Sequence, residues 1–238
     1  MEKEYYRQDS LIFSRLKALG FEPRAIFDIG SSVAGWSVTI ARVFPSAQFH
    51  LFEPLVDLKP YYKYCCDWAV GVCPNFSIHK IALGDRAGTV TIYSDAPGFS
   101  ASILPAAYDA SIPEREQVPV APLLAYVADH DLPRPDLLKI DVQGGEMLVL
   151  KGAGELLDTV QVLEAETWFS REYGPSTPLF HELLEFLESK GLQLFELGDR
   201  FYSDTHRLYS VDVFFARSEL LAQWRGKLLP EPLASTDS

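Results

Sequence analysis

Asp141 lies near the end of a short apolar run, residues 137–142, that breaks at Gly144 and Gly145. Such a run, followed by helical spacing from Glu146, predicts a buried strand, a tight turn and a helix. In an open α/β sheet these turns lie at the carboxyl edge of the strands, where ligands bind. We therefore expect Asp141 at the rim of a binding site, where a carboxylate can accept a proton.

A second strand–turn–helix pattern covers residues 25–36 and contains Gly30-Ser-Ser-Val-Ala-Gly35. A dinucleotide-binding turn reads Gly-x-Gly-x-x-Gly, and its second glycine lets a pyrophosphate approach the backbone. Ser32 stands at that second position, which disfavours a pyrophosphate. Asp28, just before the turn, suits a cationic or amine-bearing ligand better; the alternative is that Asp28 caps the following helix.

Glu53 follows the next expected strand, residues 48–52. A carboxylate at that position commonly accepts hydrogen bonds from both hydroxyls of a ribose. An acid on the first strand, an open glycine turn and a ribose-binding acid together indicate S-adenosylmethionine as the ligand. The alternative is that Glu53 is only the solvated end of a strand.

The chain has 238 residues, of which 47% are hydrophobic, and this suits one large α/β domain with a substantial core. Its net charge of -12 argues against nucleic acid as a partner, because phosphate binding needs a basic face. Residues 1–10 contain no apolar signal region, and no run is long enough to span a membrane. We expect a cytoplasmic protein.

The three cysteines, Cys65, Cys66 and Cys73, are an odd number in one short stretch and do not form a disulfide framework. A zinc site would need a fourth ligand, and only His79 is near. Semi-buried structural thiols are the favoured interpretation.

Alternating apolar runs and breaks predict a doubly wound, mostly parallel sheet with helices on both faces. Strands are expected at residues 25–29, 48–52, 77–83, 137–142, 160–166, 192–197 and 209–216, the last two paired. Helices are expected at residues 10–19, 36–43, 58–73, 123–130, 146–151 and 180–190.

This pattern divides the chain into an N-terminal helix within residues 1–22, one α/β domain over residues 23–217 and a tail over residues 218–238. We expect the end of the tail, from residue 230, to be disordered. Residues 89–93 alternate as a hairpin partner of the third strand would, and residues 94–116 are expected to form a long loop.

Five motifs occur in a specific order: Phe27-Asp-Ile-Gly-Ser-Ser32, Phe52-Glu-Pro54, Ile81-Ala-Leu-Gly-Asp85, Leu138-Lys-Ile-Asp-Val-Gln-Gly-Gly-Glu146 and Leu150-Lys-Gly-Ala153. With them, the chain resembles the FkbM family of S-adenosylmethionine-dependent methyltransferases over residues 24–216. The resemblance implies a class I methyltransferase fold, which is Rossmann-like. It also implies O-methylation, often of sugar hydroxyls in secondary metabolites or glycans.

The resemblance further implies a set of cofactor-binding residues: Asp28, Gly30, Ser31, Glu53, Ala82, Leu83 and Asp141. The first three would line the methionine and ribose side, Glu53 would hold the ribose, and Ala82 and Leu83 would flank the adenine. For Leu83 the alternative is core packing. Asp85 is a further candidate for the adenine amino group.

Two motifs depart from the usual family pattern. Ser31 and Ser32 stand where the family usually has Ala-Asn, and Gln143 stands where it usually has Glu. The first change is expected to reshape the methionine pocket slightly, and the second removes a charge close to the expected reaction centre.

Methyl transfer to a hydroxyl needs alignment of the acceptor oxygen and benefits from a nearby base. Asp141 is a candidate for that base or for holding the methionine amine. The alternative is that Asp141 only accepts hydrogen bonds from the backbone of Gly144 and Gly145. Glu146 is expected to cap the helix that it begins.

Glu164 and Glu166 lie on one face of the fifth expected strand, and Glu166 is the candidate for contact with the acceptor. Asp141 and Glu166 are also candidates for sharing a divalent metal, a minority interpretation because no third ligand is fixed. His206, in the polar loop before the last strand, is a candidate general base; the alternative is a solvated histidine.

The favoured function is an S-adenosylmethionine-dependent O-methyltransferase that acts on a small-molecule hydroxyl, of a sugar or a sugar-bearing natural product or glycan. One alternative is a nucleotide- or NAD-binding oxidoreductase, which Ser32 and the lack of an obvious Tyr-x-x-x-Lys pair disfavour. The other is a non-catalytic binding protein that retains the fold.

Overall fold

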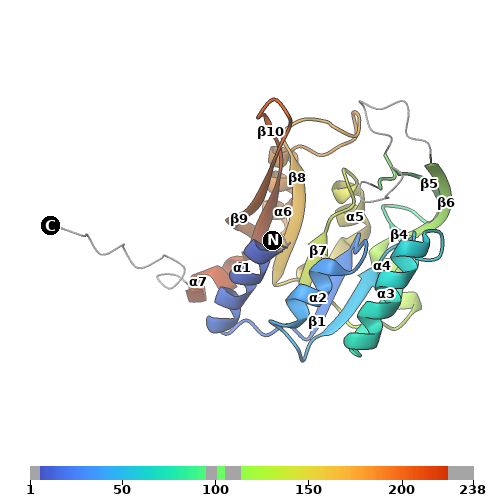
Figure 1. The fold of residues 1–238 in the computed structure, drawn as a ribbon. Coiled ribbons are helices and arrows are strands. Elements are labelled where there is room, and N and C mark those ends of the chain that lie inside the picture. Colours follow the sequence, from blue (N-terminus) through green and yellow to red (C-terminus); the bar gives the residue numbers. More distant parts are fainter. Residues whose placement is uncertain (1–5, 95–100, 105–113, 225–238) are drawn as a thin grey trace.

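The computed structural model describes residues 6–94, 101–104 and 114–224. At its centre is a seven-stranded sheet in the order β3-β2-β1-β7-β8-β10-β9 (Figure 1). The first five strands in this order run parallel, and the last two pair antiparallel. The strands are β1 (Ala25–Ile29), β2 (Gln48–Phe52), β3 (Phe76–His79), β7 (Leu137–Ile140), β8 (Val162–Trp168), β9 (Leu192–Tyr202) and β10 (Leu208–Arg217).

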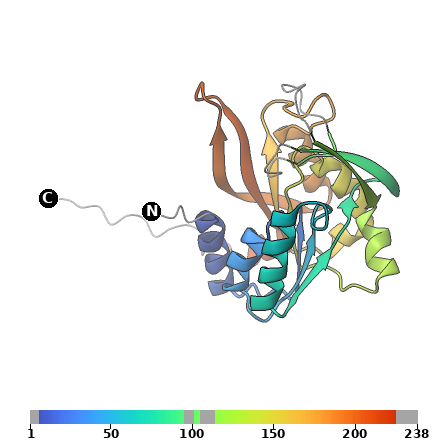
Figure 2. The same cartoon turned by 45° about the vertical axis from the view of Figure 1, so that its right-hand side comes forward.

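Helices cover both faces of this sheet, with α1, α2 and α3 on one face and α4, α5 and α6 on the other (Figures 1 and 2). Successive residues of a strand point to opposite faces, so Leu137 packs with Phe13 of α1, while Leu138 packs in the other core with Val149 of α5. The helices are α1 (Arg7–Ala18), α2 (Gly35–Ala41), α3 (Pro60–Val72), α4 (Leu123–Asp129), α5 (Glu146–Ala153), the 3₁₀ helix η1 (Gly154–Asp158), α6 (Phe180–Ser189) and α7 (Ser218–Trp224). The predicted α/β architecture is confirmed.

The third predicted strand, residues 77–83, is divided between two sheets. Its first part belongs to β3, and its end forms β4 (Ala82–Leu83) in a small sheet of order β4-β6-β5. The predicted hairpin is wrong, because β5 (Gly88–Ser94) pairs with β6 (Glu114–Ala121), which the sequence analysis had assigned in part to a loop. Pro119 obscured β6, but it pairs with Thr89 of β5, and β4 pairs only with the next two residues of β6 within the described ranges; proline is tolerated at such edge positions.

The first part of the predicted tail, residues 218–224, forms a helix. The two last strands pair as expected but are longer, and β10 continues into α7. Trp224 at the end of α7 is buried against Phe21 and Phe195, and this contact ties the helix to the core of α1 and α2. The predicted disorder from residue 230 lies outside the described residues.

No helix in the described part of the chain is long and apolar enough to cross a membrane. Cys65, Cys66 and Cys73 are free thiols on or next to α3, and Cys66 is buried. Among the residues that the structure describes, no group of His, Cys, Asp and Glu side chains is arranged to hold a metal ion, so the zinc alternative has no ligand set there.

Two helical glycines differ sharply in their surroundings. A Cβ on Gly152 of α5 would lie 1.9 Å from the carbonyl oxygen of Gly84 and 3.2 Å from the Cα of Pro122. Gly152 therefore lets α5 pack closely against two backbone segments, the one just after β4 and the one just before α4. A Cβ on Gly71 of α3 would meet nothing within 4 Å.

We predict that Gly152→Ala destabilises the protein by about 1–3 kcal/mol, because the methyl group must push α5 away from Gly84. Gly71→Ala is the matched control and should leave stability unchanged or raise it by up to about 1 kcal/mol, since alanine favours a helix. Urea unfolding of both variants measures the free energies. Equal stability of Gly152→Ala and wild type would contradict the proposed close contact.

Candidate active site

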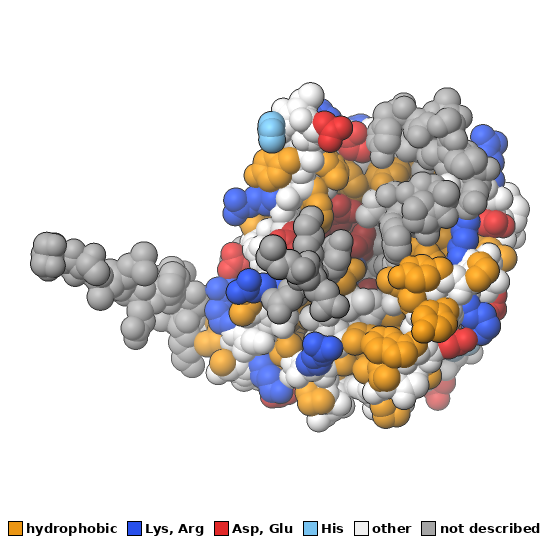
Figure 3. Space-filling model, in the orientation of Figure 1, with side chains coloured by type: hydrophobic (Ala, Val, Ile, Leu, Met, Phe, Trp, Pro, Cys, Tyr) orange, Lys and Arg blue, Asp and Glu red, His pale blue; other side chains and the backbone are white. Residues whose placement is uncertain are grey.

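A cavity of about 670 Å³ opens at the carboxyl edge of the central sheet. Its wall is built from the turn after β1, the end of β2, the first turn of α3, β4 and the end of β7, with Tyr6 at the start of α1. Acidic side chains lie in the hollow at the centre of the face shown in Figure 3. Ligand binding is predicted at this edge from the glycine turns that follow the strands.

Gly30 brings the turn after β1 against the end of β7. Its φ is +80°, and a Cβ there would lie 1.8 Å from the carbonyl oxygen of Asp141, so only glycine fits. The backbone N–H groups of Gly30 and Ser31 both donate to the carbonyl oxygen of Phe52, at 3.0 and 3.2 Å. Gly30 and Ser31 line the cavity, and the hydroxyl of Ser31 is buried without a hydrogen-bond partner in the described part of the chain.

Glu53 lies in the cavity wall and is only 6% exposed, so it is not a solvated strand end. One carboxylate oxygen accepts the N–H of Ser32 and the other accepts the N–H of Leu55, both at 2.9 Å. Each oxygen thus keeps a further lone pair for a ligand. Burial raises the pKa of Glu53 to about 7, although these two backbone donors counteract the rise.

The apolar part of the wall comes from β4 and its neighbours. Ala82 and Leu83 line the cavity together with Ile81 and Phe52. Leu83 also packs in the core with α4 and α5, as the core-packing alternative predicts. Asp85 is exposed and lies outside the lining residues.

Asp28 does not reach the cavity. It is fully buried on the face covered by α2, where its carboxylate accepts the hydroxyl of Ser37 at 2.6 Å. It makes no capping bond to the backbone of α2 either. The prediction of Asp28 as a lining residue fails because strand alternation turns its side chain towards the helix rather than towards the edge. Burial raises the pKa of Asp28.

Lys139 lies at the centre of a charged row that crosses three parallel strands. Asp28 of β1 is in register with Lys139 of β7, which is in register with Glu164 of β8. The ammonium group is 3.1 Å from the carboxylate of Asp141 and 3.7 Å from that of Asp28. Burial alone would lower the pKa of Lys139, but these carboxylates and Glu164 raise it well above the usual value.

Two aromatic contacts complete the row. The Lys139 ammonium lies 5.7 Å from the centre of the Trp36 ring, and the indole N–H of Trp36 donates to Glu164 at 3.1 Å. Burial, and secondarily Asp9, raises the pKa of Glu164 well above its usual value. Glu164 is therefore a buried structural acid, while Lys139 and Trp36 also line the cavity.

Asp141 lines the cavity as predicted, with about a third of its side chain exposed (34%). One of its oxygens accepts a hydrogen bond from Lys139 at 3.1 Å and the other accepts the side-chain N–H of Gln143 at 2.9 Å. The backbone of the glycine turn binds elsewhere: the N–H of Gly144 donates to Glu146 at 2.9 Å. The alternative for Asp141 was that it accepts hydrogen bonds from the backbone of Gly144 and Gly145. The N–H of Gly144 binds Glu146 instead.

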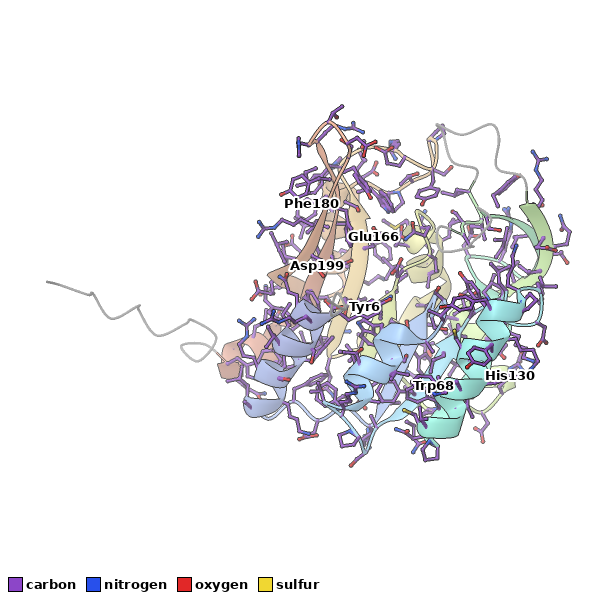
Figure 4. All side chains as sticks on the ribbon, viewed as in Figure 1. Tyr6, Trp68, His130, Glu166, Phe180 and Asp199 are labelled. Atoms are coloured by element: carbon purple, nitrogen blue, oxygen red, sulfur yellow. The ribbon has the colours of Figure 1, made fainter. Side chains whose placement is uncertain are left out.

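Glu166, labelled in Figure 4, lies on β8 and is not among the residues that line the cavity. Its oxygens accept the hydroxyl of Ser210 at 2.9 Å and the side-chain N–H of Gln143 at 2.8 Å. Burial, and secondarily Asp141, raises its pKa well above the usual value. For the metal alternative, the described residues provide no third ligand beside Asp141 and Glu166.

His206 lies in the turn between β9 and β10. It is exposed, has a left-handed backbone with a φ of +57°, and donates its backbone N–H to Ser203. It is outside the set of lining residues, so the structure does not bring it to Asp141.

The lining residues that were not predicted as site residues include Tyr6, Trp36, Tyr62 and Lys139. Lys139 had a usable signal, because a lysine inside an apolar strand must find buried anions. Tyr6 had no sequence signal, since it lies far from the motifs in the chain. Burial raises the pKa of Tyr6 to about 12.

The strand order and the cavity define a class I methyltransferase fold. Three solved structures share it: the methyltransferase FkbM from Methylobacillus flagellatus KT, the magnesium protoporphyrin IX methyltransferase ChlM from Synechocystis PCC 6803 and the O-methyltransferase TomG from Streptomyces achromogenes. Sequence identities are 16%, 11% and 14%, and TM-scores are 0.52, 0.52 and 0.50. The matches cover 81%, 88% and 89% of this chain and 43%, 77% and 80% of those chains. At such identities, the likeness establishes the fold alone.

The family model for the methyltransferase FkbM domain matches residues 28–194. The chain therefore belongs to the FkbM methyltransferase family, and the predicted family, fold class and family methyl donor, S-adenosylmethionine, are confirmed. It spans less than half of the Methylobacillus flagellatus protein that it matches. No curated protein matches the chain.

We predict that Lys139→Met destabilises the protein by about 3–5 kcal/mol at pH 8, because it leaves buried carboxylates without their cation. The loss should shrink as the pH falls, since Asp28, whose pKa is already raised, then takes up a proton in the folded state. Lys80→Met, which breaks the exposed pair with Asp57, is the control and should cost no more than about 1 kcal/mol. Urea unfolding at pH 6 and pH 8 measures both. Equal losses of unfolding free energy in the two variants would show that Lys139 does not neutralise the buried carboxylates.

Proposed function

We propose that the protein is an S-adenosylmethionine-dependent O-methyltransferase acting on a small-molecule hydroxyl, of a sugar or a sugar-bearing natural product or glycan. The observation that carries the proposal is one cavity lined by two differently equipped acids. Glu53 has a free lone pair on each oxygen, and Asp141 is held by two side-chain donors.

The residues present fit the cofactor. The two carboxylate oxygens of Glu53 match the two hydroxyls of a ribose, and the apolar wall at Ala82 and Leu83 suits an adenine. The buried hydroxyl of Ser31, which has no hydrogen-bond partner among the residues described, offers a further polar contact beside the glycine turn. These are the residues that would hold the cofactor.

Bound S-adenosylmethionine would supply an electrophilic methyl group, whose bond to sulfur breaks as the bond to the acceptor oxygen forms, with S-adenosylhomocysteine as the leaving group and the hydroxyl proton to be accepted by a base. Asp141 is the proposed acceptor of that proton. Lys139 and Gln143 each hold one oxygen of Asp141, so the carboxylate is oriented before an acceptor arrives and loses little freedom on binding. A second lone pair on each oxygen remains for the hydroxyl.

The oxidoreductase alternative is weakened by the turn after β1. The N–H of Ser32, which a dinucleotide-binding turn would direct at a pyrophosphate, donates to Glu53 instead. A binding protein without catalysis remains the second candidate, because Gln143 replaces a charge that the family usually has near Asp141.

We predict that Glu53→Ala weakens S-adenosylmethionine binding about 100-fold, since two hydrogen bonds to a charged group are lost. Glu188→Ala, on the exposed face of α6, is the control and should bind as wild type does. Because burial raises the pKa of Glu53 to about 7, and ribose hydroxyls bind its ionised form, affinity should rise from pH 6 to pH 8 in wild type. Calorimetry at three pH values measures this, with Glu53→Gln expected to flatten the slope. Wild-type protein that binds no S-adenosylmethionine would refute the proposed cofactor.

We predict that Asp141→Asn lowers kcat for methyl transfer by about 10²–10⁴, because general-base catalysis is lost, while leaving S-adenosylmethionine affinity nearly unchanged. An acceptor panel of sugars and glycosides, with release of S-adenosylhomocysteine as the readout, provides the substrate. Asp129→Asn on α4, which lies outside the cavity lining, is the control. Full activity of Asp141→Asn would remove Asp141 as the base. Binding of the cofactor without turnover of any acceptor would favour the non-catalytic candidate.

A further inference from the structure

The side-chain amide of Gln143 lies between two carboxylates. Its nitrogen donates to Asp141 at 2.9 Å and to Glu166 at 2.8 Å. A primary amide has two N–H donors, so both are used. One nitrogen atom therefore joins an acid on the cavity wall to an acid behind the wall.

The orientation of this amide is fixed from several elements. Its oxygen accepts the hydroxyl of Tyr173 at 2.6 Å, and its nitrogen faces the two carboxylates, whose oxygens accept. The backbone of Gln143 has a left-handed φ of +54°, and its carbonyl oxygen accepts the hydroxyl of Ser102 at 2.5 Å. The amide cannot turn without losing three side-chain hydrogen bonds.

The charges around this contact explain why a bridge is needed. Glu166 is 7% exposed, and its register partner on β10 is Asp212. Lys139, which contacts the other oxygen of Asp141, also neutralises Asp28. Burial and the Asp141 carboxylate raise the pKa of Glu166, and a polar donor between the two acids counteracts their repulsion.

We propose that Gln143 is a positioning residue whose amide takes the place of a shared proton or a divalent cation between Asp141 and Glu166, and so holds Asp141 in the orientation needed to accept a proton. The second half of this statement rests on the proposed function; the bridging itself does not. Gln143 contributes donors without charge, and the pair is ordered before any ligand binds.

A glutamate at position 143 would replace the amide donors between Asp141 and Glu166 with carboxylate oxygens, which accept hydrogen bonds and carry a negative charge. Three carboxylates would converge where two now share an amide, and oxygen ligands of this kind are those that Mg²⁺, Mn²⁺ and Ca²⁺ prefer. Gln143→Glu should therefore gain a divalent-cation site. Gln143→Leu keeps a similar volume and leaves the two acids without a bridge.

The first test needs no turnover. Binding of Mn²⁺ is measured by electron paramagnetic resonance on wild type, Gln143→Glu, Gln143→Glu with Asp141→Asn, and the control Gln117→Glu, an exposed residue of β6. Gln143→Glu should bind Mn²⁺ with a dissociation constant of about 10⁻⁴ M or below. Wild type, Gln117→Glu and the double variant should bind at least about tenfold more weakly. Wild-type binding as tight as that of Gln143→Glu, or no gain in Gln143→Glu, would overturn the proposal.

The second test separates positioning from folding. Gln143→Leu should lower kcat about 10–100-fold, as removal of an orienting partner does elsewhere, with the S-adenosylmethionine dissociation constant unchanged. Gln143→Glu should be slow with a chelator and should recover with Mn²⁺, whereas Gln143→Leu should not respond to Mn²⁺. A rate unaffected by Gln143→Leu, or equal responses of both variants to Mn²⁺, would refute the positioning role. If wild type methylates nothing, the proposed function fails, but the Mn²⁺ comparison still decides whether Gln143 is the bridge.

Discussion

The rest of the structure depends on one buried cation. Lys139 lies between the carboxylates of Asp28, Asp141 and Glu164, which come from three neighbouring strands of the sheet or their ends. A buried positive charge is tolerated only when such partners are close. This requirement fixes the register of β1, β7 and β8, because a shift of one residue would move Lys139 to the opposite, apolar face. It also orients Asp141, so the contact that stabilises the sheet prepares the candidate base.

The cavity wall is made by close approaches that few residues allow. Gly30 lets the turn after β1 contact the Asp141 carbonyl, and this contact places the glycine turn and Asp141 in the wall of one cavity. Ser32 and Gln143 are both held at positive φ, which is uncommon outside glycine and costs free energy. Both are positions at which the chain departs from the usual family motifs. Their backbone strain is compensated by hydrogen bonds, from Ser32 to Glu53 and from Tyr173 to Gln143.

Most of the fold could be predicted from the sequence, because its parallel strands are apolar runs with clear breaks and its helices have one apolar face. The failures have a common cause. β6 begins with charged residues and contains Pro119, and α7 is short, so neither has a strong local pattern. Both form because distant partners exist: β5 for β6, and the aromatic contacts of Phe21 and Phe195 for Trp224.

The sequence by itself determined the order of the main elements, the glycine turns and the acids near the strand ends, since each is a local property of a few neighbouring residues. Only the tertiary structure decided which of these acids reach the cavity. Glu53 and Asp141 line it, Asp28 and Glu166 lie behind it, and His206 is far along an exposed hairpin. The difference depends on the direction of each side chain and on its cross-strand partner. Those are set by packing between segments distant in sequence, which no spacing of residues along the chain records.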